Sequence, residues 1–346
     1  MQKSLSAIAA LLLLAGCSRT TAVKFTITGS DPSFADGKYM HLYIDGEPDL
    51  SADSARIENS AFTLRSTRPF PISAYLYMEQ EQIGYSFILE DGTIRVVSDG
   101  DDFLFTGTPQ NDRANKLRLE AANLYRSGRT PCEIAEAMDS LSLAVIRGNR
   151  NALGLSLLKE ASKGSMSAEE ILRLADGFPE EFRQHPTMIE IRERAENMRA
   201  DIGKPYIDIT GESPEGEAAS LADIVRNPRN KYVLLEFGAS WCGPCREEIP
   251  RIVGIYEKYR DRGLGIFGVS FDSGRKTWLQ SIDEYGMQWP QVLPEPGQAP
   301  RATKVWQDYS LDGIPANFLV DCAAGTIVAK NLRGELLTAK IAELLD

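Results

Sequence analysis

Two cysteines separated by two residues, Cys242 and Cys245, are the strongest chemical signal in this sequence of 346 residues. The pair follows an apolar run that ends at Phe237 and precedes a polar run that begins at Arg246, an order that predicts a strand, a short turn and a helix. Two thiols in the first turn of a helix can close a small disulfide ring, and the helix N-terminus favours the thiolate of the first cysteine. The spacing therefore predicts a redox-active dithiol.

A Cys-x-x-Cys pair can also supply half of a four-ligand zinc site, which then needs a second cysteine pair or two suitably spaced histidines. The remaining cysteines are isolated in the sequence, at positions Cys17, Cys132 and Cys322. The two histidines, His41 and His185, lie in separate segments. This ligand count favours redox chemistry over zinc binding, and we expect neither a metal site nor a cofactor.

Residues 236–245 (Glu-Phe-Gly-Ala-Ser-Trp-Cys-Gly-Pro-Cys) resemble the active-site strand and loop of the thioredoxin superfamily, and Gly313-Ile314-Pro315 resembles the cis-proline loop of that superfamily. Further similarity lies at Glu248, at Trp289-Pro290 and at Arg333-Gly334. These positions resemble the membrane-tethered TlpA and ResA-like oxidoreductases, whose redox module is of the AhpC/TSA-like type.

The resemblance implies a role for each matched residue. Cys242 should be the more exposed sulfur and the attacking thiolate, and Cys245 should resolve the mixed disulfide. Glu236, inside an apolar strand, should be buried, have a raised pKa and relay a proton to or from Cys245. Glu248 is either a second active-site acid or a surface glutamate of an acidic helix. Trp241 either shields the pair and contacts a polypeptide or packs in the core.

The matched proline loop implies a protein substrate. Pro315 should follow a cis peptide bond, and the backbone of Ile314 should then pair with an extended substrate strand. A Cys-Gly-Pro-Cys centre resembles that of thioredoxin, which favours reduction of disulfide-containing protein substrates. The family further implies a membrane electron donor of the DsbD or CcdA type.

A thiol peroxidase of the AhpC/TSA type is the alternative enzyme. The peroxidatic cysteine of those proteins lies in a Pro-x-x-x-Thr-x-x-Cys pattern. Leu235 and Ala239 occupy the corresponding proline and threonine positions before Cys242. This mismatch argues against peroxide reduction.

The N-terminus has the features of a secretory signal. Lys3 precedes a mostly apolar run at residues 5–14, and small residues end the run directly before Cys17. The run is too short to span a bilayer. Its end resembles the bacterial lipobox, so residues 1–16 should be removed and Cys17 should carry a lipid anchor. We expect an extracytoplasmic protein on a bacterial membrane, facing the periplasm or the cell surface. An ordinary cleaved signal with an incidental cysteine is the alternative.

The periodicity of the apolar residues changes twice along the rest of the chain. Residues 17–110 contain short alternating runs that predict an antiparallel β-sandwich-like domain, and they resemble the β-rich domain of unknown function in lipoproteins of the Bacteroidetes group. Residues 111–200 have helical periodicity and predict a segment of four or five helices. Residues 201–346 alternate strands and helices, as in an α/β thioredoxin fold.

The charge of the chain limits its partners. A formal net charge of −11 argues against nucleic acid and against attraction to anionic lipid surfaces. The leading hypothesis is a lipid-anchored thiol-disulfide oxidoreductase. The alternative from another class is a surface binding or scaffold lipoprotein, in which residues 17–200 hold a partner and the redox module is auxiliary.

Overall fold

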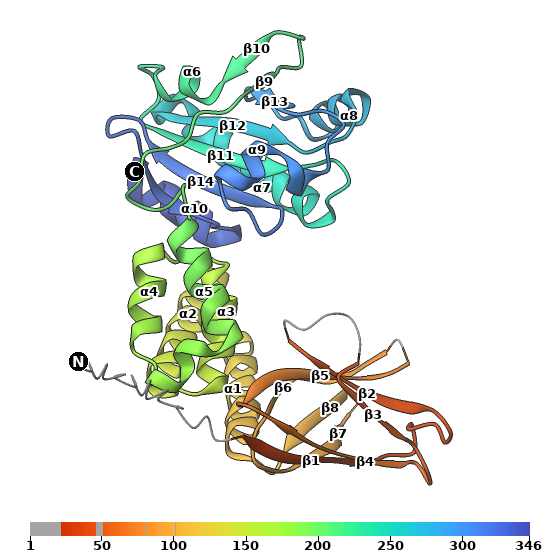
Figure 1. Cartoon of the computed structure of the whole chain (residues 1–346). Coiled ribbons are helices and arrows are strands. Elements are labelled where there is room, and N and C mark those ends of the chain that lie inside the picture. The colour runs from red at the N-terminus through yellow and green to blue at the C-terminus, as the bar shows by residue number, and fades with distance from the viewer. Residues whose placement is uncertain (1–21, 46–50, 80, 101) are drawn as a thin grey trace, which may run out of the picture.

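The computed structural model describes residues 22–45, 51–79, 81–100 and 102–346, and for Cys132 the backbone alone. The predicted signal sequence and the predicted lipid attachment residue, Cys17, lie outside these residues. Figure 1 shows three parts along the chain: strands at one end, helices in the middle and a mixed α/β part at the other end.

The first part consists of two sheets that share one core. One sheet has the order β4-β1-β7-β8 and the other has the order β3-β2-β5-β6. The strands of the first sheet are β1 (Val23–Ser30), β4 (Ala61–Arg68), β7 (Gly92–Asp99) and β8 (Asp102–Thr106). Those of the second are β2 (Tyr39–Ile44), β3 (Asp53–Arg56), β5 (Ile72–Met78) and β6 (Glu81–Leu89). Alternate residues of both sheets, such as Ile27 and Leu42, are buried in the common core, which confirms the predicted period.

The pairing of β1 with β7 differs from the expected antiparallel arrangement. Phe25 lies opposite Gly92 and Gly29 lies opposite Val96, so the two strands run parallel. Parallel neighbours need a long connection, and here the strands β2 to β6 supply it. Alternation of apolar residues identifies strands but carries no information about the direction of a distant partner.

Five α-helices follow the sandwich, within the predicted number. They are α1 (Pro109–Tyr125), α2 (Pro131–Gly148), α3 (Ala152–Ser162), α4 (Ala168–Asp176) and α5 (Pro186–Asn197), with a short 3-10 helix at Glu180–Gln184. The hydroxyl of Ser167 accepts a hydrogen bond from the Glu170 backbone at the start of α4. A reciprocal capping box lies at Thr130 and Glu133, at the start of α2.

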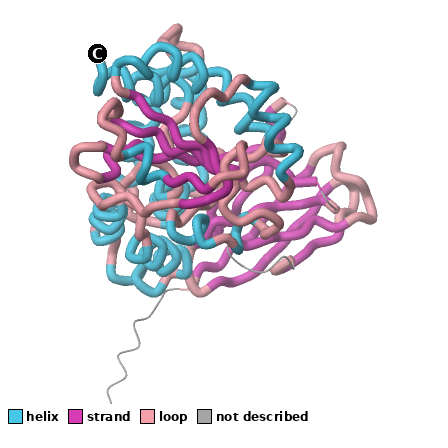
Figure 2. The backbone as a smooth tube through the Cα atoms, turned by 90° about the horizontal axis from the view of Figure 1, so that it is seen from above, coloured by secondary structure: helices cyan, strands magenta, loops and turns pink. Residues whose placement is uncertain are grey.

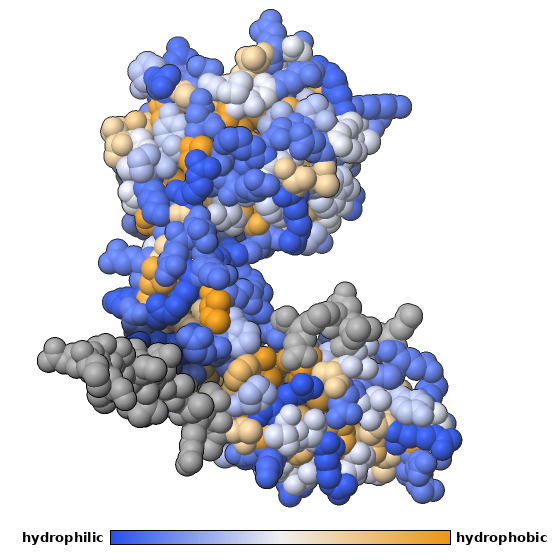
Figure 3. Space-filling model, in the orientation of Figure 1, coloured by the Kyte–Doolittle hydropathy of each residue, from blue (hydrophilic) through white to orange (hydrophobic). Residues whose placement is uncertain are grey.

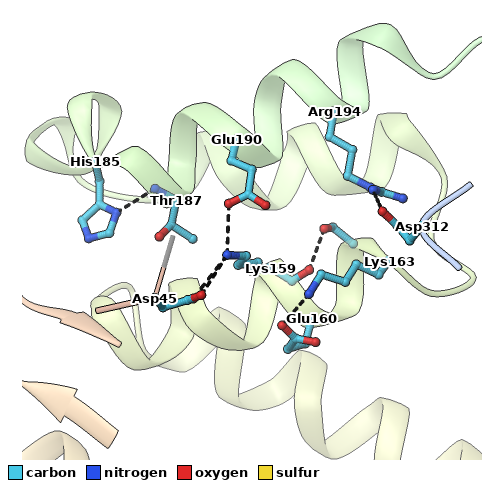
Figure 4. A network of polar contacts seen from close by, with 10 residues as sticks. Asp45, Lys159, Glu160, Lys163, His185, Thr187, Glu190, Arg194 and Asp312 are labelled. Atoms are coloured by element: carbon cyan, nitrogen blue, oxygen red, sulfur yellow. Dashed lines mark hydrogen bonds and ion pairs between the residues drawn. The ribbon is translucent and has the colours of Figure 1, made fainter. Parts of the chain in front are cut away.

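Charged contacts join the helices to both neighbouring parts (Figure 4). Lys159 Nζ on α3 lies 3.2 Å from Asp45 of the sandwich and 3.0 Å from Glu190 on α5. Near the other end of α5, Arg194 forms an ion pair with Asp312 of the α/β part. The helices therefore connect the sandwich to the redox module through side chains as well as through the backbone.

A five-stranded sheet of order β13-β12-β11-β14-β15 forms the centre of the third part. The strands are β11 (Tyr232–Gly238), β12 (Leu264–Ser270), β13 (Gln291–Val292), β14 (Ala316–Asp321) and β15 (Thr326–Lys330). A small hairpin of β9 (Thr210–Glu212) and β10 (Ala218–Ser220) precedes them. The helices are α6 (Leu221–Val225), α7 (Gly243–Tyr259), α8 (Arg275–Tyr285), α9 (Lys304–Asp308) and α10 (Gly334–Leu345), with 3-10 turns at Arg260–Arg262 and Pro300–Ala302.

Both faces of this sheet are buried, as Figure 2 illustrates with helices around the strands. Leu235 on β11 packs in one cluster with residues of α6 and α9, whereas Leu234 packs in a second cluster with α7 and α10. A central strand that is covered on both sides needs a continuous apolar sequence, and β11 has one apart from Glu236. This arrangement confirms the predicted thioredoxin fold.

The surface in the view of Figure 3 is mostly hydrophilic, with scattered apolar residues. Over the residues that the structure describes, none of the helices combines the length and the apolar character needed to cross a membrane.

Candidate active site

The two predicted redox cysteines form a disulfide at the start of α7, with an S–S distance of 2.07 Å. Cys242 is the N-cap of this helix, and the backbone N–H of Cys245 donates a hydrogen bond to Cys242 Sγ at 3.2 Å. A donor and a helix N-terminus that both face one sulfur stabilise negative charge on it. In the reduced protein, this geometry favours the thiolate on Cys242.

The two cysteines do not differ in exposure as predicted. Cys242 is 5% exposed and Cys245 is 4% exposed. The carbonyl oxygen of Ile314, which is 72 residues away in sequence, lies 3.6 Å from Cys242 Sγ and helps to cover it. The preference for Cys242 as the attacking sulfur therefore rests on its place at the helix N-terminus and not on a larger exposed surface.

Trp241 lies beside the disulfide and is 57% exposed. The alternative in which this ring packs in the core is therefore wrong. An exposed indole next to the sulfurs offers apolar contact area to a partner molecule, which a solvated polar side chain would not.

The predicted cis peptide bond between Ile314 and Pro315 is confirmed. The loop that contains it borders a cleft of about 510 Å³, which is also lined by Lys163, directly after α3, and by Arg194 of α5. The guanidinium of Arg333 donates a hydrogen bond to the carbonyl oxygen of Pro315. The proline loop thus lies between the redox pair and the helical part, where an extended segment can reach Cys242.

Glu236 on β11 has a buried carboxyl oxygen, Oε2, which has no hydrogen-bond partner among the described residues. Burial raises the pKa of Glu236 to about 8. A hydrogen bond from Asn317 opposes this effect and lowers the pKa. The nearby charge of Glu248 raises the pKa further, and the charge of Arg333 lowers it. Glu236 and Cys245 line the same small pocket, of about 50 Å³. The carboxyl is therefore neutral at low pH and becomes a base in the range where thiols titrate.

Glu248 on α7 is partly buried, and its Oε1 accepts a hydrogen bond from the backbone N–H of Gly334 at 2.8 Å. This bond caps the first turn of α10, whose N-cap residue, Arg333, makes no side-chain cap of its own. Glu248 is thus not a solvated surface glutamate. It joins two helices and acts on the titration of Glu236.

Two polar residues of this region were not predicted from the sequence. Asp272 is buried and accepts hydrogen bonds from the backbone and hydroxyl of Ser240, so it fixes the loop before Trp241. Asn317 lies opposite Glu236 on the neighbouring strand β14. Asn317 could have been identified from the sequence, because it is a polar residue inside the apolar run of β14. The role of Asp272 is visible only in the folded protein, where its loop meets the loop before Trp241.

Of the cysteines outside the pair, Cys322 is the one whose side chain the structure describes. Cys322 is a free, partly buried cysteine, and burial raises its pKa to about 11. For Cys132 the side chain lies outside the described atoms. Within the described ranges, no group of three or more histidine, cysteine or acidic side chains is placed to hold a metal ion.

Two family models match the chain. Residues 202–330 match the AhpC/TSA family, and residues 25–114 match a domain of unknown function, DUF4369. Together they cover the sandwich and most of the α/β part, and the helices from α2 to α5 lie between them.

Several proteins of known name are similar to the α/β part. The thiol-disulfide oxidoreductase ResA of Bacillus cereus is 27% identical over 136 residues, which are 39% of this chain and 72% of that protein. The thioredoxin-like protein YneN of Bacillus subtilis is 30% identical over 34% of this chain and 65% of that protein. The solved thioredoxin domain of a thiol-disulfide oxidoreductase from Bacteroides vulgatus is 34% identical, with a TM-score of 0.38, and covers 42% of this chain and 98% of that chain.

Proposed function

Because residues 202–330 belong to the AhpC/TSA family and the chain is a thiol-disulfide oxidoreductase with a thioredoxin fold, we propose that it reduces protein disulfides outside the cytoplasm. The observation that carries this proposal is the Cys242–Cys245 disulfide at the N-terminus of α7, directly beside the carbonyl oxygen of Ile314. The pair is reversible, and the loop next to it presents backbone to an incoming polypeptide.

The reaction has two exchange steps. The Cys242 thiolate attacks a substrate disulfide, so that a bond from Cys242 Sγ to one substrate sulfur forms and the other substrate sulfur leaves as a thiolate. Cys245 then attacks Cys242 Sγ, which closes the internal disulfide and releases the second substrate thiolate. The substrate gains the two electrons that the dithiol loses.

Three features support a polypeptide as the substrate. Trp241 is exposed beside the sulfurs, the Ile314 backbone lies at Cys242, and the cleft behind Pro315 continues toward the helices. A peroxide would need none of these surfaces, and the positions before Cys242 lack the peroxidatic proline and threonine. Reduction of protein disulfides therefore accounts for more of the site than peroxide reduction does.

Replacing Glu236 with glutamine is expected to remove an inflection near pH 8 from the pH profile of insulin reduction. With a pKa of about 8 in the wild-type protein, the carboxylate that can take the Cys245 proton increases as the pH rises, and an amide cannot take a proton. We expect the rate at pH 8 to fall about tenfold, because solvent bases replace the carboxylate only in part. Initial rates between about pH 6 and pH 9 measure this. Glu247→Gln, at an exposed position of α7, is the matched control, and identical profiles for wild type and Glu236→Gln would remove the relay role.

The location is the second part of the proposal. The signal-like residues 1–16 and the small residues before Cys17 support a lipid anchor on a bacterial membrane that faces the periplasm or the cell surface. A reductant in an oxidising compartment needs a supply of electrons, for which a membrane donor of the DsbD or CcdA type is the proposed partner. Release of Cys17→Ser from the membrane fraction is the expected result, and retention of this variant would exclude the anchor.

Trapping of substrates in cells tests the proposed activity. Cys245→Ser retains the attacking thiol but cannot resolve the intermediate, so substrates should remain linked to Cys242. We expect several proteins in reductant-sensitive complexes with Cys245→Ser and none with the control Cys242→Ser. Recovery of small thiols alone would contradict a protein-directed reductase.

A further inference from the structure

A second hollow adjoins the cleft beside the proline loop. The first cleft reaches Ile314, whose carbonyl oxygen lies 3.6 Å from Cys242 Sγ. The second hollow is a groove of about 670 Å³ along α5. Arg194, Ser310 and Leu311 line both hollows, so the two meet at these residues. A continuous path therefore leads from the redox pair onto the helical part.

The second hollow, which we call the α5 groove, extends over the whole length of that helix. Its lining residues on α5 run from Pro186 to Asn197, and the others lie between Trp306 and Leu311. The 12 residues of α5 correspond to a length of about 18 Å. An extended polypeptide covers that length with about five or six residues. The groove is therefore long enough for a substrate segment beyond the cysteine that reacts.

The side chains that line the α5 groove include several apolar ones. Trp306 and Leu311 are each 8% exposed, whereas Ile189 on α5 is 39% exposed. Pro186, at the start of α5, is a further exposed apolar residue. Figure 3 shows apolar surface on the helical part. Because apolar surface in water gains free energy when a partner covers it, the groove favours a large apolar side chain of a bound molecule.

The charge of the α5 groove limits its occupant further. Three charged residues line it, namely Glu190, Glu193 and Arg194. Glu190 lies 3.0 Å from Lys159, and Arg194 forms an ion pair with Asp312. Glu193 is exposed and has no ion pair among the described residues. A carboxylate without a counter-charge at the rim of a groove attracts a basic side chain and repels an acidic one.

We propose that the α5 groove is a docking site for the polypeptide substrate. It binds a large apolar side chain and a neighbouring basic side chain, several residues from the cysteine that Cys242 attacks. This inference rests on the proposed function, which supplies the reaction, and it adds the class of polypeptide that reacts best. The occupant is an extended substrate segment, because the groove continues the path by which a polypeptide reaches Cys242. The residues of α5, outside both matched family regions, determine specificity and take no part in disulfide exchange.

The test uses peptides in which the single cysteine carries thionitrobenzoate as a mixed disulfide. Attack by Cys242 forms a bond to the peptide sulfur and releases the coloured thiolate, which stopped-flow absorbance follows after mixing with the reduced protein. The peptides place leucine or serine, next to a lysine, about three to eight residues before or after the cysteine, the range in which an extended chain reaches the groove. At the best position, we expect leucine to lower the half-saturating concentration about tenfold relative to serine, with the maximum rate unchanged.

Variants of the helices assign this preference to the groove. Ile189→Ser should remove most of the preference for leucine. Leu119→Ser is the matched control, because Leu119 on α1 is 65% exposed and lines neither hollow. Glu193→Gln should remove an about threefold preference for lysine over glutamate beside the leucine, and salt should weaken that preference in the wild type. All three variants should react with the small disulfide dithiobis(nitrobenzoate) at the wild-type rate.

The peptide series on the wild-type protein covers the case in which a variant fails to fold. Equal half-saturating concentrations for leucine and serine at every position, or equal effects of Ile189→Ser and Leu119→Ser, would overturn the docking site. A dimer in sedimentation that Ile189→Ser separates into monomers would also overturn it, because a second copy would then occupy the groove. A wild-type protein that reduces insulin but reacts alike with all peptides would contradict the docking site alone. Failure to reduce insulin would contradict the proposed function itself.

Discussion

Replacing Cys242 with serine is expected to abolish reduction of insulin disulfides. The serine hydroxyl forms neither a thiolate at neutral pH nor a disulfide, so the first exchange step has no nucleophile. We expect no substitution by Cys245, because Cys242 is the N-cap of α7 and its sulfur is the one that accepts the hydrogen bond from the Cys245 backbone N–H. The measurement is the insulin-dependent oxidation of the reduced protein, for which we expect the uncatalysed background rate.

Cys322→Ser is the matched control for this loss. It makes the same chemical change at the free cysteine, whose pKa burial raises to about 11, so that almost no thiolate exists there at neutral pH. We expect this variant to retain the wild-type rate. Disulfide exchange that survives in Cys242→Ser, or disappears in Cys322→Ser, would show that Cys242 is not the attacking sulfur.

Replacing Lys330 with methionine is expected to lower the free energy of unfolding by about 3–5 kcal/mol, the usual effect of removing one partner from a buried ion pair. Lys330 Nζ lies 2.6 Å from Asp201 Oδ1, and the two side chains are 4% and 3% exposed. The other Asp201 oxygen accepts a hydrogen bond from the backbone of Ala168 at the start of α4. Methionine fills the space of the lysine stem but leaves the Asp201 carboxylate buried without its counter-charge.

Urea denaturation measures this difference, with Lys340→Met as the control. Lys340 forms a 2.8 Å ion pair with Glu343, but the two side chains are 30% and 64% exposed. Exposed pairs contribute at most about 1 kcal/mol, so this variant should unfold near the wild-type midpoint. Equal losses in both variants would show that the Lys330–Asp201 contact does not stabilise the joint between α4 and β15.

The parts of the fold that follow from local sequence were predictable. Alternation at residues such as Ile27 and Leu42 identified strands, because the side-chain period of a strand is visible in any short window. The dithiol, the buried Glu236 and the cis bond before Pro315 followed from short motifs and their resemblance to a known family. Each of these features depends on neighbours within a few residues or on a recurrent loop.

Features that depend on distant pairing were not predictable. The parallel register of β1 and β7 and the equal burial of Cys242 and Cys245 arise from segments that meet only in the folded chain. The same is true of the position of Asn317 opposite Glu236, since the strands β11 and β14 must pair before the two side chains meet.

The equilibrium reduction potential of the Cys242–Cys245 pair tests the central claim most directly. The full chain, carrying Cys322→Ser to remove that free thiol, is equilibrated in buffers with graded ratios of reduced to oxidised dithiothreitol. Thiol alkylation and mass spectrometry then give the fraction of the protein that contains the disulfide. A reductant of protein disulfides with this Cys-Gly-Pro-Cys centre should have a midpoint of about −270 mV, the value of thioredoxin. A midpoint of about −120 mV, the value of the strong oxidant DsbA, would contradict the proposed direction of electron flow.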